Sequence, residues 1–234
     1  MDNESKPIRT LSQISDTIVS CSRCERLVIW RTKVAEEKVK RFRDEDYWGR
    51  PLPGFGDSKA PLVVVGLAPA AHGGNRTGRM FTGDESGTWL IRAMHKSGFA
   101  NQATSDYKGD GLRLTGAYIT AAVRCAPPDN RPTPEEFRRC RPYLSAELDL
   151  LLPRVIVVLG RMAYDAIRVH YRDKGLDVRP WQFYHGGQIE VPDAHPVTLI
   201  TSYHPSRQNT QTGRLTQAML QSVFEQARRV LKPW

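Results

Sequence analysis

Four short apolar runs along the chain predict four strands of a sheet. They are PLVVVGL (61–67), AYITAAV (117–123), RVIVVLG (154–160) and VTLITSY (197–203). Each run is nearly continuous in apolar or β-branched residues, which is typical of strands covered on both faces. Stretches with helical patterning separate or follow these runs, at 86–98, 134–152, 161–173 and 213–231. This alternation predicts an α/β protein with a parallel sheet between helical layers.

The stretch 134–152 has the clearest helix start in the sequence. Thr133 is a suitable N-cap, and Pro134 fits the first helical position. Glu135 and Glu136 then place acids in the first turn, where the helix dipole favours them. We therefore expect this helix to begin at residue 134.

Three unusual loops each begin where a predicted strand ends. They are the first loop (66–87, GLAPAAHGGNRTGRMFTGDESG), the second loop (124–133, RCAPPDNRPT) and the third loop (203–214, YHPSRQNTQTGR). In open α/β sheets, ligands bind outside the carboxyl ends of the strands. Because parallel strands bring these ends to one edge, we expect the three loops to line a common site.

Length and composition fit a single domain, which we predict to span residues 1–234. The chain is 40% hydrophobic and 25% charged, with glycine and proline scattered rather than in tracts. No apolar run approaches the length of a membrane span, and the N-terminus MDNESKPIRT lacks the basic and apolar segments of a signal peptide. We therefore expect a cytoplasmic protein with no membrane partner.

The net charge is strongly positive. The chain carries 34 Lys and Arg against 25 Asp and Glu, which gives a net charge of +9. Such an excess favours a polyanionic partner such as nucleic acid, although many basic proteins bind none.

The four cysteines favour a metal or cluster site over disulfides, which are uncommon in cytosolic proteins. Cys21 and Cys24 form a CxxC pair, a spacing that lets one turn direct two thiolates at one metal centre. Cys125 and Cys140 can join them only through the fold. A redox CxxC with two inert thiols is the simpler alternative, but the pair follows a predicted helix, TLSQISDTIVS (10–20), rather than a strand of a βαβ unit. The spacing does not distinguish Zn²⁺ from an iron–sulfur cluster.

The first loop is similar to a phosphate-binding loop without matching one. Gly73 and Gly78 are spaced as in a P-loop, but Arg79 and Met80 stand where Lys and Ser or Thr are required. Nucleotide hydrolysis is therefore a weak interpretation, and a purely structural glycine turn is the simplest alternative.

Other side chains of the first loop suggest contact with a ligand. Phe81 is an aromatic ring in a polar loop, either tucked into the core or offered as a stacking surface. Asp84 is either the N-cap of the helix that follows or a catalytic carboxylate. His72, Arg76 and Arg79 complete this polar group.

The second and third loops add further polar groups. Asn130 has the donors and the acceptor that suit a base edge, but asparagine is also a common turn residue. His204 opens the third loop at the end of a strand, where ligands bind. Small polar residues and arginines on loops suit backbone phosphates. The residues expected to contact nucleic acid are Arg76, Arg79, Ser206, Arg207, Gln208 and Arg214.

Together these motifs resemble the family 5 (type B) uracil-DNA glycosylases. The likeness rests on GLAPAAHGGNRTGRMFTGD, AAVRCAPPDNRPTPEEF and SYHPSRQNTQTGRLT, which stand in the family's order. It also includes WGRPLPGFGD (48–57) and the four cysteines, and it covers most of the chain. The resemblance implies a three-layer α/β/α fold with a four-stranded parallel sheet of order 2-1-3-4. It also implies a DNA-repair enzyme that hydrolyses the N-glycosidic bond of uracil and leaves an abasic site.

The resemblance further implies a structural [4Fe–4S] cluster rather than zinc. Its ligands would be the four cysteines, and the cluster would pin the N-terminal segment to the second loop through Cys125. The implied metal ligands are Cys21, Cys24, Cys125 and Cys140.

The resemblance also implies roles for the site residues. Asp84 would orient or activate a water, and Phe81 would stack on the flipped base. His204 and N–H groups of the first loop would stabilise the charge that develops on the leaving uracil, with Asn130 beside the base. The remaining residues implied in substrate binding are Gly66, Ala68 and His72.

Ala68 marks a departure from other branches of the superfamily, which carry Asp or Asn at that position. Their mechanism therefore does not transfer directly, and the missing carboxylate leaves room for deaminated purines such as hypoxanthine. The expected partner is double- or single-stranded DNA containing uracil or another deaminated base, bound by a monomer. The alternative is a zinc-dependent nucleic-acid-binding protein without catalytic activity.

Overall fold

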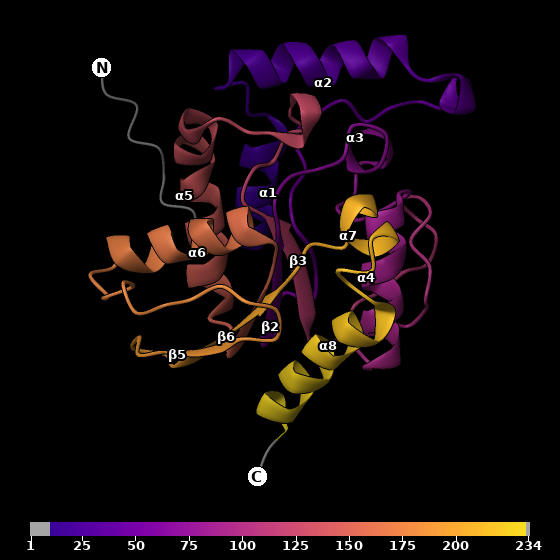
Figure 1. Ribbon diagram of the computed structural model, residues 1–234. Helices are drawn as coiled ribbons and strands as arrows, with labels where there is room; N and C mark the ends of the chain where they lie inside the picture. The colour runs from indigo at the N-terminus through magenta and orange to yellow at the C-terminus, as the bar shows by residue number, and fades with distance from the viewer. Residues whose placement is uncertain (1–9, 233–234) are drawn as a thin grey trace, which may run out of the picture.

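The computed structural model describes residues 10–232, so the ends of the predicted domain, 1–9 and 233–234, lie outside the described residues. At its centre is a six-stranded sheet of order β1-β3-β2-β4-β6-β5 (Figure 1). Its four central strands are parallel: β2 (Leu62–Gly66), β3 (Ala117–Ala121), β4 (Val155–Leu159) and β6 (Val197–Ser202). Every residue of these strands is buried, and the predicted order 2-1-3-4 is confirmed.

Two antiparallel strands that the sequence pattern did not predict extend the sheet at its edges. They are β1 (Phe55–Gly56), which pairs with β3, and β5 (Gln188–Val191), which pairs with β6. β1 has only two residues, and β5 is mostly exposed, so neither forms the continuous apolar run by which buried strands are recognised.

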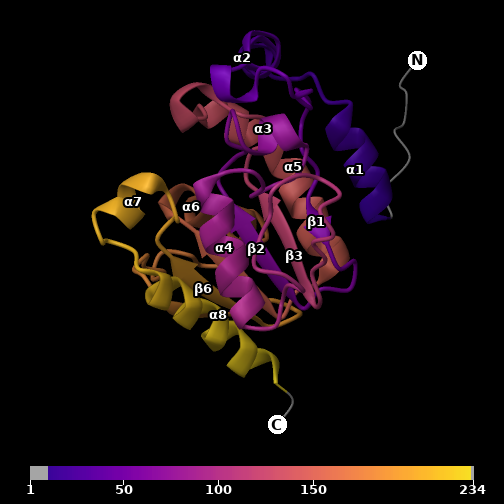
Figure 2. The same ribbon diagram turned by 90° about the vertical axis from the view of Figure 1, so that its right-hand side faces the viewer.

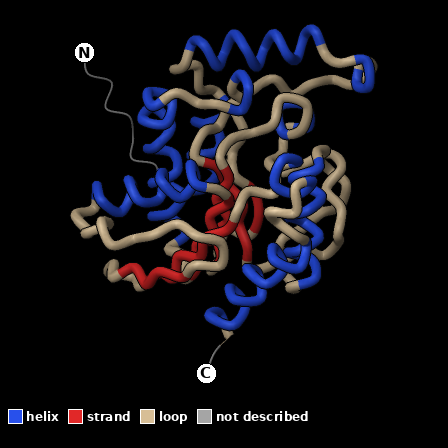
Figure 3. The backbone as a smooth tube through the Cα atoms, in the orientation of Figure 1, coloured by secondary structure: helices blue, strands red, loops and turns tan. Residues whose placement is uncertain are grey.

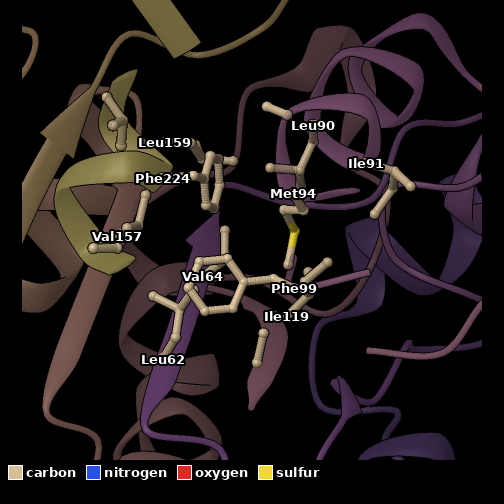
Figure 4. Packing of buried hydrophobic residues seen from close by; sticks show 14 of the residues in the cluster. Leu62, Val64, Leu90, Ile91, Met94, Phe99, Ile119, Val157, Leu159 and Phe224 are labelled. Carbon is tan, nitrogen blue, oxygen red and sulfur yellow. The ribbon is translucent and has the colours of Figure 1, made fainter. Parts of the chain in front are cut away.

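Helices cover both faces of the sheet. On one face lie α4 (Glu85–Lys96) and α8 (Gln217–Leu231), which pack side by side in Figure 2. Leu90, Phe99 and Phe224 pack there against Val64 and Ile119 of the sheet (Figure 4). On the other face lie α5 (Pro134–Leu151) and α6 (Arg161–Asp173). The predicted three-layer architecture is therefore confirmed.

The predicted start of α5 is confirmed by its capping geometry. The Thr133 hydroxyl accepts a hydrogen bond from the Glu136 backbone N–H at 3.3 Å, and the Glu136 carboxylate accepts one from the Thr133 N–H at 2.7 Å. This reciprocal capping box satisfies donors that the first turn of a helix leaves free.

Two further helices lie near the N-terminus of the chain. α1 (Leu11–Val19) packs Ile14 and Ile18 against Tyr143 of α5, and α2 (Glu25–Glu37) lies above α3 in Figure 1. The short helices η1 (Lys40–Phe42), α3 (Gly74–Thr77), η2 (Pro128–Asn130) and α7 (Arg207–Gln211) interrupt loops, which Figure 3 shows in tan. Among residues 10–232, no helix combines the length and apolar character needed to cross a membrane.

Candidate active site

The first and third loops meet at Phe81 and His204. Their ring centroids lie 6.1 Å apart, at the carboxyl edge of the sheet. The Phe81 ring packs directly over Gly66, the last residue of β2, where an added Cβ would lie 2.7 Å from two ring carbons. Phe81 also holds a left-handed backbone (φ 50°), which is rare for an aromatic residue and typical of functional sites. The ring is partly buried at this edge.

Asp84 caps α4 while its carboxylate faces the first loop. Oδ1 accepts a hydrogen bond from the Gly87 N–H at 2.8 Å, so the capping role considered from the sequence is present. Oδ2 lies against Gly73, where even a methyl group would overlap it. Burial raises the pKa of Asp84, while hydrogen bonds from the backbone N–H groups of Gly87 and Ser86 oppose the rise.

His204 is a neutral imidazole at the end of β6. Burial lowers its pKa to about 4, so the ring carries one N–H near neutral pH. Its Cβ sits over Gly160 (φ 91°), where a side chain would approach to 3.1 Å. The Asn209 amide donates to the His204 carbonyl at 2.8 Å and holds the start of the third loop. The site therefore contains an aromatic face, a carboxylate and a neutral hydrogen-bond donor.

A segment that the sequence reasoning did not assign to the site clamps the first loop. We call residues 42–49 the strap. The Trp48 N–H donates to the Arg76 carbonyl at 2.9 Å, and the Gly49 N–H donates to the Asn75 carbonyl at 3.0 Å. The Tyr47 hydroxyl lies 3.1 Å from Nδ1 of His72. In the sequence, the adjacent aromatic residues Tyr47 and Trp48 are the signal that could have indicated this contact with the first loop.

Arg76 and Arg79 require a correction, because both were expected at a DNA surface and both are buried, with 7% and 8% of their area exposed. Arg76 forms an ion pair with Glu45, and Arg79 forms one with Asp110 at 2.8 Å. The Arg76 Nε also donates to the His72 carbonyl at 2.8 Å. Each arginine is 31 residues from its acidic partner in the chain, so the sequence did not indicate either ion pair. In this structure the two arginines hold the first loop together.

Several side chains of the third loop are exposed to solvent. Arg207 is 74% exposed and pairs with Glu85 at 3.1 Å, and Gln208 is exposed beside it. Ser206 occupies the N-cap position of α7 without a capping hydrogen bond from its side chain, and the exposed Arg214 lies over the Tyr203 ring at 4.6 Å.

Asn130 lies in the second loop and Ala68 in the first loop. Asn130 ends η2, is exposed and has φ 55°, directly after Asp129 at φ 52°. Its side chain makes no hydrogen bond with the described residues. Ala68 is half-buried against the apolar cluster that contains Cys125 and Cys140.

Comparison with known proteins identifies the family. The model of the uracil DNA glycosylase superfamily matches residues 53–228. The chain belongs to this superfamily. The Type-5 uracil-DNA glycosylase of Thermus thermophilus is 50% identical over 215 residues, which cover 92% of this chain and 95% of the relative. Type-5 enzymes of Mycobacterium tuberculosis (224 residues; 94% and 82% covered) and Pyrobaculum aerophilum (210 residues; 90% and 88%) are each 46% identical. The resemblance to family 5 is confirmed.

The four cysteines of this superfamily member gather where α2, the second loop and α5 meet. All four are free thiols, Cys125 and Cys140 are buried in one apolar cluster, and Cys24 packs against it. Cys21 lies against Tyr143 in the neighbouring cluster. Within residues 10–232, no group of three or more His, Cys, Asp or Glu side chains is arranged to hold a single metal ion.

Arg31 is a buried cation directed at these thiols. It is 7% exposed, and its Nη1 donates to Sγ of Cys125 at 3.0 Å. Its Nη2 donates to the Cys21 carbonyl at 3.3 Å, and its Nε has no hydrogen-bond partner. No carboxylate among the described residues pairs with it. Because a buried guanidinium is costly without an anion, this placement fits an anionic group at the cysteines.

Proposed function

We propose that this protein hydrolyses the N-glycosidic bond of uracil in DNA and leaves an abasic site. It is a hydrolase acting on N-glycosyl bonds, as its family membership and the names of its relatives indicate. Two observations carry the proposal: the contact between the Phe81 and His204 rings at the carboxyl edge of the sheet, and the Asp84 carboxylate three residues after Phe81 at the start of α4. A non-catalytic, zinc-dependent binding protein has no support from these relatives.

Phe81 and His204 act on the base. The target nucleotide must leave the duplex, at a cost of a few kcal/mol, and an aromatic face can hold the extruded base by stacking. When the glycosidic bond breaks, negative charge develops on the uracil. A neutral imidazole fixed in position stabilises that charge by donating a hydrogen bond, together with N–H groups of the first loop. The low pKa of His204 makes it a hydrogen-bond donor rather than a proton source near pH 7.

Asp84 acts on the water. Positive charge develops on the sugar as the bond lengthens, and water must then attack C1′. The carboxylate orients that water and accepts its proton, and its N-cap geometry fixes its direction. The proposed pocket is completed by Gly66, Ala68, His72 and Asn130.

The third loop is the proposed contact with the DNA backbone. Arg207 and Arg214 supply exposed positive charge, and Ser206 and Gln208 supply polar groups. The proposed partner is DNA, single- or double-stranded, that contains uracil or a deaminated purine such as hypoxanthine. We propose that the protein acts as a monomer in the cytoplasm.

The test is base release from defined oligonucleotides. We expect uracil-containing DNA to yield abasic sites, cleavable by alkali, in the presence of EDTA, because no step uses a divalent cation. Strands with hypoxanthine in place of uracil measure the lesion range, and undamaged strands of the same sequence are the control. Absence of uracil release from both single- and double-stranded substrates would overturn the proposal.

We also propose a structural [4Fe–4S] cluster held by Cys21, Cys24, Cys125 and Cys140. Four thiolates suit such a cluster, which spreads its ligands farther apart than a single ion does. The buried Arg31 guanidinium supports it because the cluster and its thiolates together are anionic. When bound, the cluster would connect the start of α2, the second loop and α5. We assign it a structural role and no redox step.

Iron analysis tests this cluster. Protein purified without oxygen is expected to be brown, with broad visible absorption and about four iron atoms per chain. Cys140→Ser should lose most of the iron and lower the melting temperature, because one ligand is missing. Ser22→Ala, at an exposed residue between the two CxxC cysteines, is the matched control and should keep its iron. Stoichiometric zinc in place of iron would contradict the proposal.

A further inference from the structure

Tyr47 of the strap makes one specific contact with the first loop. Its hydroxyl lies 3.1 Å from Nδ1 of His72, and the two rings meet edge to face with centroids 6.1 Å apart. Both side chains are partly buried. The backbone bonds of Trp48 and Gly49 to the first loop fix the strap beside this contact.

The chemistry of the pair sets the direction of its hydrogen bond. Burial raises the pKa of Tyr47, and burial together with the Arg76 charge lowers the pKa of His72. Both groups are therefore neutral near pH 7. A phenol is the stronger donor and an imidazole nitrogen the stronger acceptor, so Tyr47 donates to Nδ1. The single ring proton of His72 then resides on Nε2, because a neutral imidazole carries one N–H.

The Nε2–H of His72 has no partner in the described protein. The Nε2 atom makes no hydrogen bond with the described residues. Because it is not fully buried, it is accessible to solvent. The residue next in sequence, Gly73, lies against the Asp84 carboxylate. An oriented donor is thus open to solvent on the residue next to the glycine that contacts the proposed catalytic carboxylate.

We propose that Tyr47 is a positioning residue that fixes His72 as a hydrogen-bond donor, through Nε2–H, to an oxygen of the extruded nucleotide. The inference rests on the proposed function. The acceptor is a base carbonyl or a phosphate oxygen, because both present lone pairs to an N–H donor. If it is a base carbonyl, the contact also selects lesions: deamination replaces an amino group by a carbonyl. The Nε2–H group of His72 can donate but not accept a hydrogen bond. It therefore cannot pair with the amino group of an undamaged base, which is also a donor.

The tautomer of His72 is measured without DNA. Two-dimensional ¹H–¹⁵N spectra that detect ring nitrogens distinguish a protonated Nε2 from a protonated Nδ1. The protein is expected to show His72 in the Nε2–H form, and Tyr47→Phe should give a mixture of both forms. Tyr171→Phe, a buried tyrosine near the far end of α6, is the matched control and should leave His72 unchanged. An Nδ1–H form in the unmodified protein would overturn the proposal, whatever the outcome of the base-release assay.

Single-turnover uracil excision tests the role of the donor. His72→Phe and Tyr47→Phe are each expected to slow excision about 3- to 10-fold, the scale of one neutral hydrogen bond. His72→Gln should be closer to the unmodified protein, because its amide places an N–H where Nε2 stood. Since an amide has no tautomers, adding Tyr47→Phe to His72→Gln should cost nothing further. If Tyr47→Phe slowed excision equally in the unmodified protein and in His72→Gln, Tyr47 would have only a structural role. That result would overturn the inference.

Two lesions distinguish the sources of the oxygen. If His72→Phe lowers the excision rate by the same factor for uracil and for hypoxanthine, the acceptor is a phosphate oxygen. If the factor differs between the two bases, the acceptor is a base carbonyl. No loss with either base overturns the proposed contact. Failure of the unmodified protein to release uracil would instead overturn the proposed function and leave the tautomer result standing.

Discussion

Replacing Asp84 by asparagine is expected to slow uracil release by about 10²- to 10⁴-fold, the range of effects typical of a lost general base. Asparagine is nearly isosteric and is a good N-cap, so the hydrogen bond from the Gly87 N–H is retained. The amide cannot accept the proton of the attacking water. Single-turnover kinetics with saturating enzyme measure the rate, and DNA affinity should change little.

A second pair of variants isolates the capping role. Asp84→Ala removes both the base and the cap, so it should also lose about 1 kcal/mol of stability. Thr10→Ala removes the cap of α1, where the Thr10 hydroxyl accepts from the Gln13 N–H at 3.2 Å. This control should be destabilised comparably but remain fully active. If Asp84→Asn and Thr10→Ala retained equal activity, the catalytic role of Asp84 would be excluded.

The activity of Asp84 should also depend on pH in a defined direction. Burial raises its pKa above the usual carboxyl range, and only the ionised form serves as base. Excision by the unmodified protein should therefore fall as the pH drops through this raised pKa. Asp84→Asn should lose that acidic limb.

Glu147→Gln is expected to cost about 3–5 kcal/mol of folding stability, the usual result of breaking a buried ion pair from one side. Glu147 and Arg124 are 0% and 1% exposed, and their closest atoms lie 2.5 Å apart. The same carboxylate accepts from the hydroxyls of Tyr118 at 3.2 Å and Thr120 at 2.5 Å. A glutamine would leave the Arg124 charge buried without a counterion. Urea unfolding followed by circular dichroism measures the loss.

Glu135→Gln, on the same helix, is the matched control. Glu135 also pairs with arginines, Arg138 and Arg139, but all three side chains are substantially exposed. Such pairs contribute about 0–1 kcal/mol because water screens them. A loss for Glu147→Gln no larger than that for Glu135→Gln would show that the buried network adds nothing to stability.

The sheet and the location of the site could be predicted from the sequence because both follow from strong local patterns. Continuous apolar runs mark the strands, and the rule for parallel sheets then places the three loops at one edge. The observed contact between Phe81 and His204 brings the first and third loops together as that rule predicts. The edge strands β1 and β5 were missed because short or exposed strands carry no such run.

The details of the site that were missed depend on contacts between distant segments. Arg76 and Arg79 look like surface cations in a list of residues, and only the fold brings Glu45 and Asp110 to them. The pairing of Tyr47 with His72 likewise joins residues 25 positions apart. Local sequence shows which groups are available, whereas their partners are set by packing.

The two glycines beneath the site restrict how it can evolve. A side chain at Gly66 would displace the Phe81 ring, and one at Gly73 would displace the Asp84 carboxylate. Neither position can be used to reshape the pocket without moving a group that we propose acts on the nucleotide. Changes in substrate range must therefore arise at other positions around the site. These two positions will stay glycine while the residues around them diverge.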